Sequence, residues 1–322
     1  MTAMVRYGVL SLVCVDDISL PDGRNATGVL GGAGTYAAAG LALAGAEDIG
    51  IISGIGADFT SEHLSWFDTW KFDTSAMTIR GPRTVRSSLV YEPSFERVET
   101  SQITPGEIRS FEPSPTEIPQ EWLPLAGIYV LRDCDQAFWN TLQETLSPKT
   151  CVLWEILGSA AVPGNWSAVA KLLPSVDIFS INQTEAKRLC DSEDLNYCLS
   201  RLMEAGARQV SLRLGADGAL HALGSERFVA SSCNYTHFVD PTGAGNTHGG
   251  ALLAAWTKSG NLRHAAAVAS AAASLAIEQH GPPQLDDATR ETMRARAANC
   301  EVREESINGE RQSAIEISRR SD

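Results

Sequence analysis

The stretch VDPTGAGNTHGGALLAAW, from Val239 to Trp256, decides what kind of fold this chain adopts. A glycine-rich turn follows an apolar strand end and precedes a run rich in alanine and leucine, so the stretch predicts a helix that begins at the turn. The first backbone N–H groups of such a helix have no acceptor within it, and they lie at the positive end of its dipole. The turn therefore predicts an anion-binding site formed by Gly243, Ala244, Gly245 and Asn246.

Asn246 is the unexpected residue of this turn. A carboxylate at this position would lie beside the anion and accept a proton, which the Asn246 amide cannot do at neutral pH. His248 follows two residues later, and imidazole is an ordinary proton acceptor near neutrality. Two residues along a helix correspond to about 200° of rotation, so His248 points away from the anion. Packing or capping is therefore favoured for His248 over a role as substitute base.

The composition is that of a globular α/β protein, with 322 residues, of which 43% are hydrophobic and 20% charged. A formal charge of −13 argues against binding to nucleic acid, because such proteins display net basic faces. The apolar run from Tyr7 to Val15 is too short to span a bilayer, so we interpret it as a first buried strand and expect no membrane association. Seven scattered cysteines without a CxxC pair indicate neither disulfides nor zinc, which favours a reducing, cytoplasmic compartment.

Short apolar runs alternate with segments of helical length along most of the chain. This alternation predicts a doubly wound α/β domain, with a mostly parallel sheet flanked by helices on both faces. The expected strands are residues 7–15, 48–53, 127–131, 151–157, 176–182, 209–215 and 218–223, and the expected helices include residues 34–44, 135–146, 165–173 and 262–278.

Three segments depart from this alternation. Residues 78–100 alternate apolar and polar side chains and predict a small antiparallel β appendage. Residues 103–124 contain five prolines and are expected to form a surface connection without regular structure. The charged tail, residues 301–322, lacks an apolar stripe and is expected to be a loose terminus after a domain spanning residues 1–300.

A pair of oxygen-bearing side chains, Asn182 and Glu185, follows the apolar run that ends at residue 182. An amide and an acid three residues apart at a strand-to-helix junction present oxygen ligands on one face, which suits Mg²⁺ and its waters. The same spacing is typical of a helix N-cap with a capping box. Both interpretations are open at this point, and the absence of GxxxxGK[ST] excludes a P-loop.

Together these motifs resemble the PfkB (ribokinase-like) family of carbohydrate and nucleoside kinases, over about Val5 to Arg290. Residues 240–246 are similar to its signature, normally Asp-Thr-Thr-Gly-Ala-Gly-Asp, and Gly250 is similar to its trailing glycine. Asn182 and Glu185 match its Asn-x-x-Glu motif, residues 215–218 match its Gly-x-x-Gly turn, and residues 31–32 match its double glycine. The resemblance implies ATP and Mg²⁺ as cofactors, a small-molecule substrate, and a β lid formed by about residues 17–30 and 78–100, through which a homodimer could form.

The resemblance also implies roles for individual residues. The turn from Gly243 to Asn246 would be catalytic, and Asn182 and Glu185 would organise the metal. The cofactor would be bound by Asn182, Glu185, Gly215, Gly218 and Thr242, and the substrate by Asp16, Gly31, Gly32, Tyr36, Arg83, Arg86 and Asp240. Side chains alternate along a strand, so one of Asp16 and Asp17 should face the pocket and the other solvent, and the resemblance favours Asp16. The alternative for the two arginines is a solvated position on an edge strand.

Departures from the family pattern place the chain in a divergent branch. The double glycine is followed by Ala-Gly-Thr-Tyr instead of the usual Asn, Glu155 stands near the usual Asp and Arg, and Asn246 replaces the catalytic Asp. A general base is typically worth ~10² to 10⁴ in rate, while positioning and electrostatics supply most of the acceleration in phosphoryl transfer. The sequence thus indicates a weak or specialised kinase, with a pseudokinase or a repurposed small-molecule enzyme as the alternative.

Overall fold

The computed structural model describes residues 6–92 and 97–305. Within these ranges a large sheet has ten strands in the order β5-β4-β1-β8-β9-β10-β11-β12-β13-β14. Neighbours from β5 to β11 are parallel, and the last three strands continue the sheet antiparallel. The strands are β1 (Tyr7–Leu10), β4 (Ile49–Gly56), β5 (Met77–Gly81), β8 (Gly127–Arg132), β9 (Cys151–Ile156), β10 (Ile178–Asn182), β11 (Gln209–Arg213), β12 (Ala219–Leu223), β13 (Glu226–Ala230) and β14 (Val302–Glu304).

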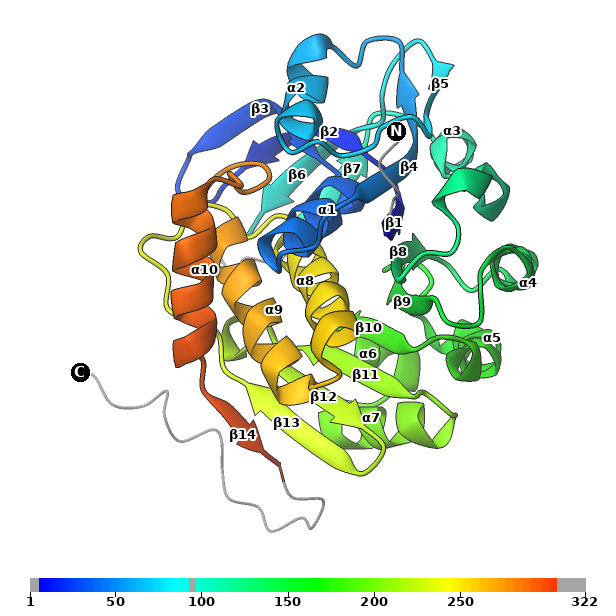
Figure 1. Cartoon of the computed structure of the whole chain (residues 1–322), viewed down its shortest axis with the longest axis vertical. Coiled ribbons are helices and arrows are strands. Elements are labelled where there is room, and N and C mark those ends of the chain that lie inside the picture. The colour runs from blue at the N-terminus through cyan, green and yellow to red at the C-terminus, as the bar shows by residue number, and fades with distance from the viewer. Residues whose placement is uncertain (1–5, 93–96, 306–322) are drawn as a thin grey trace.

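Helices cover both faces of this sheet, and a separate hydrophobic cluster fills each interface (Figure 1). One layer contains α1 (Ala33–Leu43), α8 (Ala244–Ser259), α9 (Leu262–Ala276) and α10 (Asp287–Asn299). The opposite layer contains α4 (Gln136–Thr145), α5 (Trp166–Leu172), α6 (Gln183–Cys190) and α7 (Leu195–Glu204). The predicted doubly wound arrangement is therefore present.

A small second sheet has the strand order β3-β2-β6-β7 in the described part of the chain. Its strands are β2 (Cys14–Ser19), β3 (Asn25–Gly31), β6 (Arg86–Tyr91) and β7 (Arg97–Ser101). Two expected boundaries were wrong. The first apolar run is divided between β1 and β2, and residues 77–81 form β5, which pairs with β4 in the large sheet. A short helix, α2 (Ser61–Thr69), separates β4 from β5.

The proline-rich segment, residues 103–124, is not a structureless connection. It contains α3 (Pro105–Phe111) and two short 3₁₀ helices, η1 (Pro115–Glu117) and η2 (Gln120–Trp122). Thr104 and Glu107 form a capping box around Pro105, and Ser114 and Glu117 repeat the pattern. Proline is well tolerated in the first turn of a helix, so these prolines begin helices instead of interrupting them.

The expected loose tail also begins with regular structure. Val302–Glu304 forms β14, which pairs antiparallel with β13 at the edge of the large sheet. The apolar Val302 faces Ala230 in this pairing, which explains why the first residues of the tail are fixed. Residues 306–322 lie outside the described residues.

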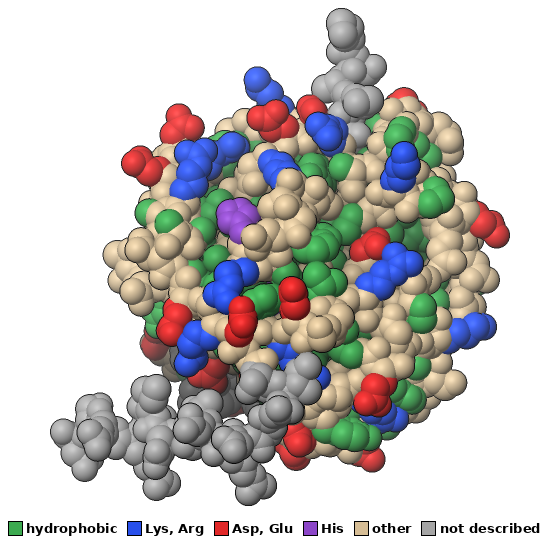
Figure 2. Space-filling view, turned by 60° about the horizontal axis from the view of Figure 1, so that its bottom comes forward, with side chains coloured by type: hydrophobic (Ala, Val, Ile, Leu, Met, Phe, Trp, Pro, Cys, Tyr) green, Lys and Arg blue, Asp and Glu red, His purple; other side chains and the backbone are tan. Residues whose placement is uncertain are grey.

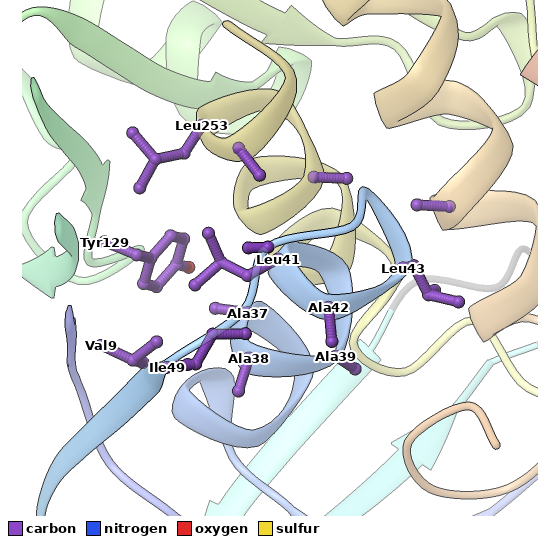
Figure 3. Close-up of a cluster of buried hydrophobic side chains, with 14 of the residues drawn as sticks. Val9, Ala37, Ala38, Ala39, Leu41, Ala42, Leu43, Ile49, Tyr129 and Leu253 are labelled. Atoms are coloured by element: carbon purple, nitrogen blue, oxygen red, sulfur yellow. The ribbon is translucent and has the colours of Figure 1, made fainter. Parts of the chain in front are cut away.

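Two glycines allow α1 and α8 to pack backbone against backbone. A Cβ at Gly40 would overlap the carbonyl oxygen of Thr247, and a Cβ at Gly250 would overlap that of Ala37. Around this contact, alanines and leucines of both helices pack with Tyr129 and other side chains of the sheet (Figure 3). Such close-packed interiors tolerate little change in volume.

The surface carries both signs of charge. On the face shown in Figure 2, acidic and basic side chains are interspersed between apolar ones. No helix within residues 6–92 and 97–305 is long and apolar enough to cross a membrane.

Candidate active site

The predicted anion-binding turn lies at the start of α8. Gly243 has φ of 77°, and a Cβ there would overlap the ring of Tyr36, so only glycine fits. The N–H of Ala244 donates to the Pro241 carbonyl at 3.3 Å. The amides of Gly245 and Asn246 occupy the first helical turn, where no intrahelical acceptor is available to them. The backbone is thus arranged to donate hydrogen bonds to an anion.

The side chain of Asn246 is held by a buried phenol. Its Nδ2 donates to the hydroxyl of Tyr129 on β8 at 2.9 Å. Burial, reinforced by the charge of Glu155, raises the pKa of Tyr129 well above its usual value, so the phenol stays protonated. The other atom of the amide, Asn246 Oδ1, is a hydrogen-bond acceptor. It can orient a hydroxyl group but cannot remove the proton of that group.

A buried ion pair between Arg213 and Glu155 lies beside the turn, and sequence reasoning missed its arginine. Arg213 ends β11 and binds both carboxylate oxygens of Glu155, with one contact at 2.8 Å, and also the hydroxyl of Ser180. Its Nε lies 3.0 Å from the position that a Cβ on Gly245 would occupy. Burial raises the pKa of Glu155, and the Arg213 guanidinium works against that rise.

Four polar residues form a row across the sheet beneath α8. Glu155, Ser180, Ser211 and His221 are register partners on β9, β10, β11 and β12. His221 stacks against His248 of α8 with ring centroids 5.5 Å apart. Burial lowers the pKa of His221 to about 4.

The pKa of His248 also lies well below its usual range, because of burial first and then the nearby His221 and Arg213. His248 faces the sheet with an exposure of only 4%. This placement agrees with the expected packing role.

Asn182 and Glu185 form the capping box of α6. Glu185 N–H donates to Asn182 Oδ1 at 2.9 Å, and Asn182 N–H donates to Glu185 Oε2 at 3.0 Å. The other carboxylate oxygen of Glu185 lies toward Gly158. Among the described residues there is no group of three or more His, Cys, Asp or Glu that could hold a metal ion. The role of this pair toward Mg²⁺ stays a prediction.

The Gly-x-x-Gly motif connects β11 to β12. Gly215 and Gly218 have φ of 67° and 95°, and a Cβ at Gly218 would overlap the Ala230 carbonyl oxygen. The side chain of Gln183, at the start of α6, donates to the Leu214 carbonyl at 3.3 Å. The hairpin thus lies beside the Asn182–Glu185 pair.

Four of the predicted substrate residues gather where the small sheet meets α1: Asp16, Gly31, Gly32 and Tyr36. Asp16 is 4% exposed and lies against Gly31, where a Cβ would overlap its carboxylate. Asp17 faces the other way and accepts from Gly28 N–H at 2.9 Å. Gly32 has φ of 82° and connects β3 to α1, so it places Tyr36 over Gly243.

Asp240 and Thr242 precede the turn and connect it to two other elements. Asp240 is fully buried, accepts from Thr242 N–H at 2.8 Å, and lies 3.1 Å from His280 Nδ1. The Thr242 hydroxyl is 2.8 Å from the hydroxyl of Tyr91 in the small sheet. Both carboxylate oxygens of Asp240 therefore have protein partners, and its role toward a substrate stays a prediction.

Of the two predicted arginines, Arg86 begins β6 as the register partner of Val15, and Arg83 precedes that strand. Arg83 is exposed, and Arg86 forms a long ion pair with Asp58 at 3.9 Å. Their proposed contacts with a substrate stay predictions.

The chain matches the family model "pfkB family carbohydrate kinase" over residues 10–287. It belongs to the PfkB family. Two relatives extend the match over most of the chain. A cytidine kinase of Thermococcus kodakarensis is 26% identical over 256 residues, covering 79% of this chain and 90% of the relative. An uncharacterized protein of Schizosaccharomyces pombe is 25% identical, covering 87% of this chain and 86% of the relative.

Solved structures of an adenosine kinase and a fructokinase share the architecture. The adenosine kinase of Sinorhizobium meliloti superposes with a TM-score of 0.73 at 18% identity, covering 91% of this chain and all of the other. The fructokinase of Vibrio cholerae, solved with fructose, ADP and calcium, gives a TM-score of 0.69 at 18% identity. The match covers 92% of this chain and 100% of the fructokinase. The fold is thus the ribokinase-like α/β fold, as predicted.

Proposed function

We propose that this protein is an ATP-dependent phosphotransferase of the PfkB type, which phosphorylates a hydroxyl group of a sugar, a nucleoside or a related small molecule. The observation that carries the proposal is the position of the α8 turn beside the carboxyl ends of the parallel strands that bear Asn182 and Arg213. Ligands of open α/β sheets bind at this edge. Kinase relatives support the same activity.

ATP and Mg²⁺ fit the residues present. When bound, they would supply the transferable phosphoryl group and neutralise its charge. The amides of the α8 turn, with Thr242, would hold the phosphates, and Asn182 and Glu185 would hold the metal through its waters. The Gly215–Gly218 hairpin would contact the nucleotide. An E. coli neighbour with a TM-score of 0.71 at 18% identity was solved with ATP and Mg²⁺.

The acceptor hydroxyl would lie between Asp16, the double glycine and the α8 turn. Asp16 would hold a substrate hydroxyl, and Tyr36 would limit the size of the pocket. Asn246 Oδ1 would orient the attacking hydroxyl without taking its proton. We therefore propose that turnover is slow, by roughly the 10² to 10⁴ that a general base contributes.

A second candidate function is binding without phosphorylation. The hydrogen bond from Asn246 to Tyr129 favours it, because this bond fixes an amide at the position of the family's base. Calorimetry with Mg-ATP, followed by a panel of sugars and nucleosides read by mass spectrometry, distinguishes the two functions. Binding with a phosphorylated product supports the kinase. Binding without product on any substrate supports the second function, and a lack of binding at millimolar nucleotide contradicts the kinase.

A further inference from the structure

Arg213 lies at the point where three parts of the site meet. It is the last residue of β11 and the register partner of Asn182 on β10. Its Nε edge lies against Gly245, in the first turn of α8. A Cβ at position 245 would lie 3.0 Å from Nε, a tight contact, so the second glycine of the turn also makes room for this arginine.

The guanidinium is fixed by groups on the far side from the turn. Both Nη atoms bind Glu155, and Nη1 also binds the Ser180 hydroxyl. These partners come from β9 and β10, so the planar fork is held by the sheet itself. Arginine loses little further freedom when such a preorganised fork binds an oxyanion.

The charges around the turn leave a place for an anion. The positive end of the α8 dipole and the Arg213 guanidinium lie side by side, and the carboxylates of Glu155 and Glu185 act on the guanidinium from the sheet side. Glu155 lies one helical turn deeper, with its Oε2 3.4 Å from the Cβ position of Gly249. Glu155 thus neutralises Arg213 from below and does not reach the open amides of the turn.

We infer that Arg213 is a phosphate-binding residue of this site, positioned by Glu155, and that it donates to the same anion as the amides of Gly245 and Asn246. The inference rests on the proposed function for the identity of the ligand, a phosphoryl group of a nucleotide. The geometry itself requires only a phosphate-like oxyanion. The opposing interpretation is a purely structural ion pair.

Replacing both members of the pair provides the test, because removing one alone would leave a buried charge. Arg213→Leu/Glu155→Leu is compared with wild type for binding of pyrophosphate and of Mg-ATP by calorimetry, with thermal unfolding to establish that the variant is folded. Arg80→Leu/Glu117→Leu is the matched control, since this pair joins partly buried side chains at β5, the edge strand six positions away from β11 in the large sheet. We expect pyrophosphate binding to weaken roughly 10- to 100-fold in the first variant, as for a lost charged hydrogen bond, and to be unchanged in the control.

Arg213→Lys keeps the charge without the planar fork, and we expect it to bind with intermediate affinity. If the folded Leu variant binds pyrophosphate as tightly as wild type, the ion pair is structural and the inference is overturned. The same conclusion follows if wild type binds neither probe. If wild type binds pyrophosphate through Arg213 and does not bind Mg-ATP, the proposed function fails while the inference stands.

Discussion

The Asn246 side chain has nearly the same shape as an aspartate, with an amide nitrogen in place of one carboxylate oxygen. The contacts of this nitrogen indicate what an aspartate would change. The amide donates to Tyr129, whose phenolic hydrogen is free to rotate. An aspartate at this position would accept from the phenol instead. Because Asp and Asn are nearly isosteric and an acid is favourable at a helix N-terminus, the fold is expected to tolerate the change.

Asn246→Asp should therefore raise phosphorylation of the accepted substrate by ~10² to 10⁴, the usual contribution of a general base. Turnover of Mg-ATP over the same sugar and nucleoside panel measures the effect, and Asn246→Ala is the control that removes the amide without adding a base. An unchanged rate in the Asp variant, with Mg-ATP still bound, would refute the idea of a kinase one substitution from full activity.

Glu155 is expected to influence the pKa of an aspartate at position 246. It lies near Tyr129 beneath α8, and like charges at short distance raise each other's pKa. We expect Asn246→Asp/Glu155→Gln to lower the pKa of the new carboxylate relative to the single variant. The pH–rate profiles of the two variants test this, with the acidic limb at lower pH in the double variant. Identical profiles would mean that Glu155 does not influence position 246.

At the scale of elements, the sequence predicted strand and helix identities better than the contacts among them. The α8 turn and the α6 cap were readable because each is local, with its signals within seven residues. Arg213 and Glu155 are 58 residues apart, and only the register of three strands brings them together. A charged residue at a strand end does not indicate in the sequence which residue it pairs with. The ion pair between Arg213 and Glu155 could therefore be identified only from the structure.

The contact between α1 and α8 gives a stability prediction. Gly250→Ala places a methyl group against the Ala37 carbonyl, and we expect a loss of about 1–3 kcal/mol, as for other overpacked interiors. Thermal or urea unfolding measures it. Gly106→Ala is the control, because its Cβ would meet only the Thr104 hydroxyl at 4.0 Å, and helical alanine is favoured over glycine. Equal stability of the two variants would contradict the close packing.

The stacked histidines predict acid sensitivity. The pKa of His221 is lowered to about 4 in the folded protein, against about 6.5 in an unfolded chain, so the unfolded state takes up the proton first. This contribution is fully present above pH 6.5 and is lost as the pH falls toward 4, by roughly 1–1.5 kcal/mol at pH 5.5.

Urea unfolding of wild type and His221→Leu/His248→Leu at several pH values isolates the effect of the pair. We expect the difference in unfolding free energy between the two proteins to depend on pH below 6.5. A constant difference from pH 7.5 to 5.5 would show that the histidines do not titrate between the folded and unfolded states.

At the scale of the whole molecule, the small sheet offers a surface for self-association. Val90 and Val98 are cross-strand partners on β6 and β7 and are 43% and 52% exposed. We propose that this face forms the homodimer expected from the sequence. Val90→Lys should shift the molar mass measured by light scattering toward the monomer, whereas Tyr197→Lys, at an exposed position on α7, should not. A wild type that is monomeric at high concentration would contradict the proposal.

The overall architecture was predictable, because it follows from the order of the motifs and from the alternation of apolar runs with helical segments. The connections between the elements were not predictable in this way. Thr104-Pro105 and Ser114-Pro115 were counted as breakers, although each is followed by the glutamate of a capping box. Residues 7–15 formed one apolar run in sequence, yet the chain leaves the large sheet after Leu10 and enters the small one at Cys14. Apolarity alone does not distinguish which sheet a strand joins.

The backbone contact between α1 and α8 also holds the starts of these two helices together. Gly32 precedes α1 and the Gly243 turn precedes α8, so the two glycine segments belong to one rigid body. The small sheet is joined to it by connections of at most four residues, at 11–13, 32, 82–85 and 102–104. We expect these connections to act as hinges, and an outward movement of the small sheet would break the hydrogen bond between Tyr91 and Thr242. Opening would then release ligands while the spacing between the two glycine segments stays constant.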